Sequence, residues 1–244
     1  MPKNAGTVVI REVADGVWTF SKPFSRFGLI PFGGRSTAIK LSDGGVWVLA
    51  STPLTPETKA KLSELGPVTY IVGADAVHHL FLGEYKKAYP DAKLIAVEEA
   101  IQKKAKEGLK FDGSWGKDPD GTNYGFEDDI KHVFFSGFKN KDVAFFHEAS
   151  KTLIEADLLF NLPAKEQYSL TGSSGKFPIF KNLHPYNKFH HNFVWSLGVD
   201  KEVMARDART VAEWDFERVI PCHGDVIEKE GNKAWRTVYA RYLK

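Results

Sequence analysis

The chain has 244 residues, of which 43% are hydrophobic and 26% are charged, and its formal net charge is +2. These proportions are ordinary for a globular protein, and no basic stripe accompanies them, which argues against nucleic-acid binding. No apolar run approaches the ~20 residues that a membrane span needs, and the first residues lack the apolar segment of a signal peptide. We therefore expect neither nucleic acid nor membrane among its partners.

The chain contains one cysteine, Cys222, so it cannot form an intramolecular disulfide bond. A chain without disulfides suits a reducing compartment, and we expect a cytoplasmic protein. This length allows one large domain or two small ones. Since no linker rich in Pro, Ser or Gly divides the chain, the sequence predicts a single domain over residues 1–244. It leaves the oligomeric state open.

Short apolar segments between turn residues predict strands first, then alternating strands and helices. Alternation predicts two hairpins, residues 7–13 with 17–20 and residues 37–41 with 46–50. Further predicted strands span residues 68–72, 93–97, 132–136, 143–147, 152–156 and 218–221. Predicted helices span residues 56–65, 78–89, 98–107, 201–214 and 233–243. The longer segments at residues 21–35, 111–129 and 158–193 are expected to be loops. This order fits two sheets with helices outside better than one parallel sheet.

Several side chains with chemical potential follow predicted strands. Two adjacent histidines, His78 and His79, lie where the strand at residues 68–72 passes into a helix, and strand ends are where α/β folds carry their chemistry. His147, Asp157 and His223 lie at the ends of later strands. Imidazole nitrogen and carboxylate oxygen bind zinc or iron at ~2.0–2.2 Å, so these residues are candidate metal ligands.

The order of elements resembles the metallo-β-lactamase superfamily over nearly the whole chain. The segments Val-His-His-Leu-Phe-Leu-Gly-Glu (77–84), Phe-Phe-His (145–147) and Ala-Asp-Leu-Leu-Phe-Asn (156–161) resemble a divergent, poorly characterised branch of it. The resemblance implies an α/β fold, an αββα sandwich of two mixed β-sheets flanked by helices. It also implies that the active site lies along one edge of the two sheets.

The superfamily motif His-x-His-x-Asp-His falls on residues 74–79, which read Ala-Asp-Ala-Val-His-His. Alanine replaces both leading histidines, His78 stands at the Asp position, and His79 keeps the closing histidine. The resemblance matches the remaining family ligands to His147, Asp157 and His223. The first metal site therefore loses two of its three ligands, whereas each position of the second site keeps a group that can bind metal.

The resemblance thus implies a metal-dependent hydrolase with one divalent metal, zinc first and iron or manganese as alternatives. The implied ligands are His78, His79, Asp157 and His223, with the last three as the core. His78 is a fourth ligand or orients the attacking water, and His147 is a nearby residue that either supports a ligand from behind or serves as a general acid. We expect a small-molecule substrate, a lactone, ester, thioester or amide, with an apolar moiety for the aromatic segments at residues 24–32 and 177–195.

The adjacent histidines leave an alternative open, because neighbouring side chains on a helix point ~100° apart. Both can bind one ion only if the turn is unwound there. Two further readings of the whole chain also stand. Two histidines and one carboxylate describe a non-haem iron redox centre. The lost leading histidines favour a metal-free sandwich that serves as a ligand-binding or scaffolding module.

Overall fold

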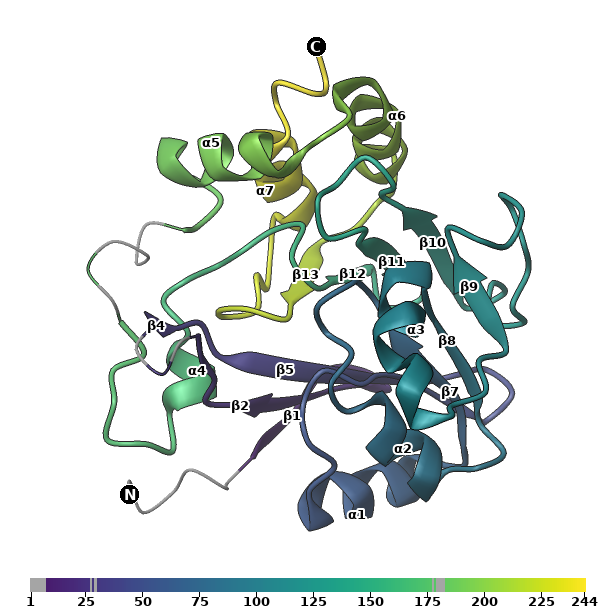
Figure 1. The fold of residues 1–244 in the computed structure, drawn as a ribbon. Helices are drawn as coiled ribbons and strands as arrows, with labels where there is room; N and C mark the ends of the chain where they lie inside the picture. The colour runs from purple at the N-terminus through teal and green to yellow at the C-terminus, as the bar shows by residue number, and fades with distance from the viewer. Residues whose placement is uncertain (1–7, 27, 29, 177, 179–182) are drawn as a thin grey trace.

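Seven strands form the first sheet in the order β1-β2-β5-β6-β7-β8-β9 (Figure 1). The computed structural model describes residues 8–26, 28, 30–176, 178 and 183–244. The strands of this first sheet are β1 Val9–Ala14, β2 Val17–Lys22, β5 Gly34–Lys40, β6 Val46–Leu49, β7 Val68–Gly73, β8 Lys93–Val97 and β9 Gly113–Trp115. Neighbouring strands up to β6 pair antiparallel, whereas β6 to β9 pair in parallel, as helical crossovers require.

Four strands form the second sheet in the order β10-β11-β12-β13. They span Ile130–Phe134, Val143–His147, Thr152–Glu155 and Arg218–Pro221. The first three pair antiparallel, and β12 and β13 run parallel, so this sheet is mixed as well. A separate two-stranded ribbon pairs β3 (Ser25–Arg26) with β4 (Ile30–Pro31) inside the segment predicted as a loop.

Helices cover the outer faces of both sheets. α1 (Pro56–Leu65), α2 (Leu82–Ala88) and α3 (Glu98–Lys104), the last followed by the short η1 (Ala105–Glu107), lie over the first sheet. α5 (Lys188–Leu197), α6 (Lys201–Ala212) and α7 (Gly231–Val238) gather at the second sheet (Figure 1). A single turn, α4 (Lys165–Tyr168), lies near β2. Two mixed sheets with flanking helices confirm the predicted αββα sandwich.

Strand β11 shows why the sandwich holds together. Its side chains alternate between faces, as strand geometry demands. Phe145 points inward and meets Trp47 of the first sheet edge-on, with ring centroids 5.0 Å apart. Phe146 points outward and stacks on Trp214 at 5.5 Å, within the cluster formed by α5, α6 and α7. Because both faces are covered, the strand is apolar from Val143 to Phe146, and only its last residue, His147, is polar.

Several predicted elements differ from the structure. Residues 111–129 contain β9, and residues 158–193 contain α4 and the start of α5, so neither segment is a loop throughout. The predicted helix at residues 78–89 begins only at Leu82. Asp75 explains the delay, because its carboxylate accepts hydrogen bonds from the amides of Val77 and His78 at 2.8 and 2.7 Å and holds a turn.

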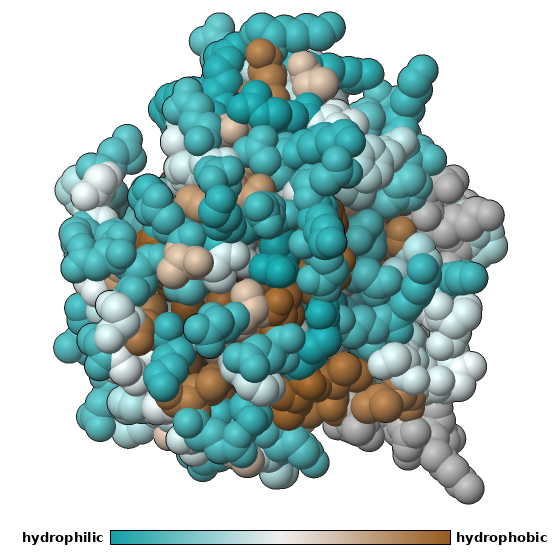
Figure 2. Space-filling view, turned by 180° about the vertical axis from the view of Figure 1, so that it is seen from behind, coloured by the Kyte–Doolittle hydropathy of each residue, from teal (hydrophilic) through white to brown (hydrophobic). Residues whose placement is uncertain are grey.

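The surface seen from behind is mostly hydrophilic, and hydrophobic residues show mainly in its middle and lower part (Figure 2). None of the helices within the described ranges is long and apolar enough to cross a bilayer. Residues 27, 29, 177 and 179–182, which belong to the two aromatic segments expected to meet a substrate, lie outside the described residues.

Candidate metal centre

Three strand ends meet at one edge of the sandwich. His78 lies five residues after the end of β7, in the turn held by Asp75. Asp157 and His223 each lie two residues after their strands, β12 and β13. These two strands are parallel neighbours, and Glu155 pairs in register with Pro221. Asp157 and His223 therefore leave the sheet side by side, although 65 residues separate them in the sequence.

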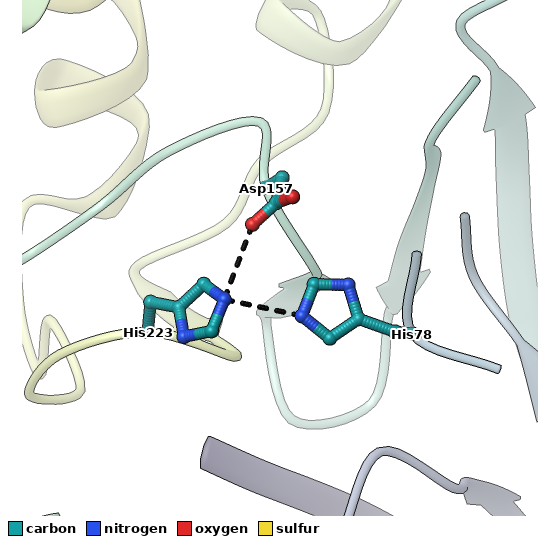
Figure 3. Close-up of side chains that lie close together, drawn as sticks. All are labelled: His78, Asp157 and His223. Carbon is teal, nitrogen blue, oxygen red and sulfur yellow. Dashed lines mark hydrogen bonds and ion pairs between the residues drawn. The ribbon is translucent and has the colours of Figure 1, made fainter. Parts of the chain in front are cut away.

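The side chains of His78, Asp157 and His223 converge (Figure 3). The two Nε2 atoms of the histidines are 3.1 Å apart, and Asp157 Oδ1 is 3.3 Å from His223 Nε2. Two nitrogen ligands of a tetrahedral zinc ion, each at about 2.0–2.1 Å from it, stand roughly 3.3 Å from each other. The two nitrogens therefore have the spacing of two ligands to a single ion, and the carboxylate oxygen lies within 4.8 Å of both.

The remaining ring nitrogens show which way the imidazoles face. His223 Nδ1 is 2.7 Å from the carbonyl oxygen of Gly33, which only accepts hydrogen bonds, so Nδ1 carries the proton. His78 Nδ1 likewise donates to Asp75 Oδ1 at 3.0 Å. In the neutral rings, both Nε2 atoms then bring lone pairs together at 3.1 Å. This contact requires a shared cation, either a proton or a metal ion, so the residues present fit a metal.

Electrostatics around His78 favour positive charge. Burial alone lowers the pKa of His78, but the carboxylates of Asp75 and Asp157 outweigh burial and raise that pKa from its usual 6.5 to about 10. Burial raises the pKa of Asp75, yet the charge and hydrogen bonds of His78 lower it overall. Asp75 therefore stays ionised. The site attracts a cation to its centre, and a metal ion must displace the proton that otherwise sits there.

Asp157 is held by two residues that precede β11. Its Oδ2 accepts a hydrogen bond from Asn140 Nδ2 at 2.6 Å, which directs Oδ1 toward His223. Its backbone amide donates to Asp142 Oδ2, also at 2.6 Å. Burial and neighbouring carboxylates raise the pKa of Asp142 well above its ordinary value, so this carboxyl group adds little negative charge. Such outer contacts fix the orientation of a metal ligand.

Aromatic rings enclose His223. Phe160 stacks on its imidazole with centroids 5.5 Å apart and planes at 9°, and Phe32 meets it edge-on at 5.6 Å. Phe24 stacks at 6.2 Å and remains 46% exposed. One side of the cluster is therefore an apolar wall with an accessible ring at its rim.

His79 does not join the cluster, which corrects the predicted core set. Its Nδ1 is buried without a hydrogen-bond partner in the described part of the chain, and its pKa is lowered by burial and then by Lys103 and Lys104 of α3. These lysines hold the same turn, since Lys103 donates to the carbonyl of Ala76 and Lys104 to that of Leu80. The turn that directs His78 toward the sheet edge sends the next side chain toward α3.

His147 also lies elsewhere, so the expected role as a nearby general acid needs correction. It pairs with Thr152, the first residue of β12, whereas Asp157 follows the last. With strands rising ~3.3 Å per residue, His147 lies roughly 13 Å along β11 from the site edge. Its Nδ1 contacts Ser150 Oγ at 2.8 Å, and burial lowers its pKa. Asn140 stands at the site edge instead.

The sequence reasoning missed Asp75, Asn140 and Asp142. Asp75 carried a signal, because it lies inside the degenerate motif three residues before His78, the spacing of a side chain that caps a turn. The sequence held no signal for Asn140 and Asp142, because only the antiparallel direction of β11 shows that the start of this strand reaches the site. The two motif alanines, Ala74 and Ala76, are buried and offer no ligand.

The structure resembles solved metallo-β-lactamases. The enzyme from Hirschia baltica is 11% identical, with 96% of this chain and 97% of that chain covered and a TM-score of 0.62. FIM-1 from Pseudomonas aeruginosa, solved in a mono-zinc form, is 10% identical with 97% of each chain covered and a TM-score of 0.60. A flavodiiron core from Synechocystis sp. PCC6803 is 12% identical, covers 97% of this chain and 60% of that one, and has a TM-score of 0.68.

At such low identity these matches show the fold, which is metallo-β-lactamase-like, as the sequence motifs predicted. No protein among the curated ones matches the chain in sequence. One family model does match, over residues 14–174, about two thirds of the chain, and its description is a domain of unknown function, DUF4336. The chain, with its sandwich and its altered motif, belongs to the DUF4336 family.

Proposed function

We propose that this protein is a metal-dependent hydrolase with a mononuclear site formed by His78, Asp157 and His223. The contact between the two Nε2 atoms carries the proposal. With both Nδ1 atoms carrying protons, the two Nε2 atoms lie 3.1 Å apart and share a cation between them, with a carboxylate oxygen 3.3 Å from one of them. Three protein ligands of this type are the set that a catalytic zinc takes.

The chain's own residues hold that set in place. Asp75 and Gly33 fix the two imidazoles through their Nδ1 atoms, and Asn140 fixes the carboxylate of Asp157. A bound divalent ion would lower the pKa of water toward 7 and polarise a carbonyl oxygen. Zinc is the first choice, and the donor atoms also suit iron and manganese.

We further propose a small carbonyl substrate, a lactone, ester, thioester or amide, that carries an apolar group. Phe24 supports this proposal because it lies against His223 with 46% of its surface exposed. Val77 and Leu80, in the turn that bears His78, are 41% and 62% exposed. Exposed apolar side chains near two of the three ligands favour an acyl chain or a ring beside the reacting carbonyl.

The test begins with chelator-treated protein reloaded separately with zinc, manganese and iron. The assay panel holds nitrophenyl esters of increasing acyl length, a lactone, a thioester and an amide. We expect one ion per chain and a kcat/KM of ~10⁴ M⁻¹s⁻¹ or more for one class, in the range of ordinary enzymes. His223→Ala should abolish the activity, whereas His147→Ala should keep it. Full activity in His223→Ala, or no turnover with any metal, would refute the proposal.

A second candidate function is redox chemistry at iron. Two histidines and one carboxylate are also the ligands of non-haem iron oxygenases, and the cluster of His78, Asp157 and His223 has that composition. Oxygen uptake by the iron-loaded protein, without hydrolysis by the zinc-loaded protein, would favour this candidate. Hydrolysis with zinc and no oxygen uptake with iron would favour the first.

A further inference from the structure

The amide of Gln167, on the short helix α4, spans the turn that carries His223. Its Nε2 donates to the carbonyl of Cys222 at 2.8 Å, and its Oε1 accepts from the amide of Gly224 at 3.0 Å. Gln167 is 1% exposed. One side chain, from a segment more than 50 residues away, therefore binds the backbone on both sides of His223.

The opposite side of this turn is held as well. Arg35 is fully buried and donates from Nη1 to the carbonyls of Pro221 and Gly224 at 2.6 and 2.7 Å. Gly33, two residues before Arg35, accepts from the His223 ring. A Cβ atom built on Gly33 would lie 2.0 Å from Gln167 Oε1, so the Gln167 amide packs directly against the residue that orients the ring.

This arrangement affects metal binding, because a metal ligand on a loop keeps its position only if the loop is fixed. A functional side chain must stay within about 0.5 Å of its working position. His223 follows β13 by two residues, and the strand itself ends at Pro221. Without Gln167, the carbonyl of Cys222 and the amide of Gly224 would be buried without these partners, and the turn would shift to find others.

We propose that Gln167 is a positioning residue for the metal ligand His223, acting by holding the Cys222–Gly224 backbone from both sides. The inference rests on the proposed metal centre, and it adds a residue that touches neither the ion nor the substrate. Gln167 sets the distance between His223 Nε2 and the donor atoms of His78 and Asp157.

The first measurement is zinc affinity, by competition with a chromophoric chelator. Gln167→Leu keeps the approximate size and removes both hydrogen bonds. Asn232→Leu is the matched control, because Asn232 Nδ2 also donates to two backbone carbonyls, those of Ala212 and Trp214, near the opposite end of β13. We expect Gln167→Leu to weaken zinc binding ~10–100-fold, which is the usual effect of losing a contact behind a ligand. The zinc affinity of Asn232→Leu should equal that of the wild type.

The second measurement needs no metal. Cys222 is the only cysteine of the chain, it is 3% exposed, and it precedes His223, so its reaction with a thiol reagent reports on this turn alone. In the metal-free protein, we expect Cys222 to react at least ~10-fold faster in Gln167→Leu than in the wild type, since each 1.4 kcal/mol of lost local stability is tenfold. Asn232→Leu, compared at equal distance from its melting temperature, should react at the wild-type rate.

A milder variant covers the case in which Gln167→Leu does not fold. Gln167→Met keeps the unbranched length of the side chain and adapts to its surroundings but loses both hydrogen bonds, so both effects should go in the same direction. Wild-type zinc affinity and thiol reactivity in a folded Gln167 variant would overturn the inference, as would equal losses in Asn232→Leu. If the wild type binds no metal yet Cys222 reacts faster in the Gln167 variants, Gln167 still holds this turn, but His223 is not a metal ligand and the proposed function fails.

Discussion

Exchanging the two adjacent histidines for alanine, one at a time, tests the metal centre most directly. His78→Ala removes one of three converging donor atoms, whereas His79→Ala removes a side chain that faces α3. A ligand that binds only the folded state stabilises it, by about 2.7 kcal/mol when its free concentration is 100 times the dissociation constant. For a chain of this size, that corresponds to a rise in melting temperature of roughly 5–11 °C.

The loss can be worked out from the same relation. Removing a contact behind a ligand costs about 10–100-fold in affinity, so removing the ligand itself should cost at least ~100-fold. At an unchanged zinc concentration the stabilisation then falls to about 0.4 kcal/mol, less than roughly 2 °C. His79→Ala keeps all three donor atoms and should show the full zinc-dependent rise in melting temperature.

The assay is a thermal melt of each variant with chelator and with zinc. The difference within each variant is the relevant quantity, because His78→Ala also leaves the buried carboxylate of Asp75 without its ion-pair partner and lowers the metal-free baseline. Loss of the zinc-dependent shift in His79→Ala, together with its retention in His78→Ala, would show that the ligand assignment is wrong.

Three further predictions concern neighbouring residues. Asp75→Asn weakens the orientation of the His78 ring and should reduce zinc affinity ~10–100-fold in chelator competition; unchanged affinity would contradict this role. Gly33→Ala should destabilise the fold by more than ~1 kcal/mol in urea, because Gly33 has φ +71° and a Cβ would strike Gln167. Burial lowers the pKa of His190 to about 3. Between pH 6.5 and 3, His190 is therefore protonated in the unfolded chain but neutral in the folded chain. Stability should therefore fall from pH 6.5 toward 3, and His190→Asn should flatten that slope by up to ~1.4 kcal/mol per pH unit; an unchanged slope would refute a neutral His190.

The sequence by itself determined most of the elements, because local interactions set them. Thr55 directly precedes the segment predicted as a helix, and its side chain accepts from the amide of Thr58 at 3.2 Å at the start of α1. The strands of the sandwich core follow apolar runs that bury both faces. Their order along the chain, with the altered motif, carries the resemblance that implied the sandwich.

The sequence could not decide between His78 and His79. Both are histidines at one turn, and the family motif favoured His79 for the core set. The decision depends on where each ring finds charged partners. Asp75 from the same turn and Asp157 from the second sheet surround His78, whereas the lysines of α3 face His79. Asp157 and the lysines come from other elements, so only the packed structure brings them to these histidines.

The position of His147 relative to the site also could not be deduced from the sequence, because it depends on the direction of its strand. A residue at the end of a strand is at the site edge only if that strand runs toward the site. β11 runs antiparallel to β12, so its last residue, His147, is far from Asp157, and its leading segment with Asn140 is close. The sequence therefore determined which residue types were available at strand ends. Strand order and strand direction decided which of these residues meet. Both depend on pairing between strands that are far apart in the sequence and on the crossovers that connect them.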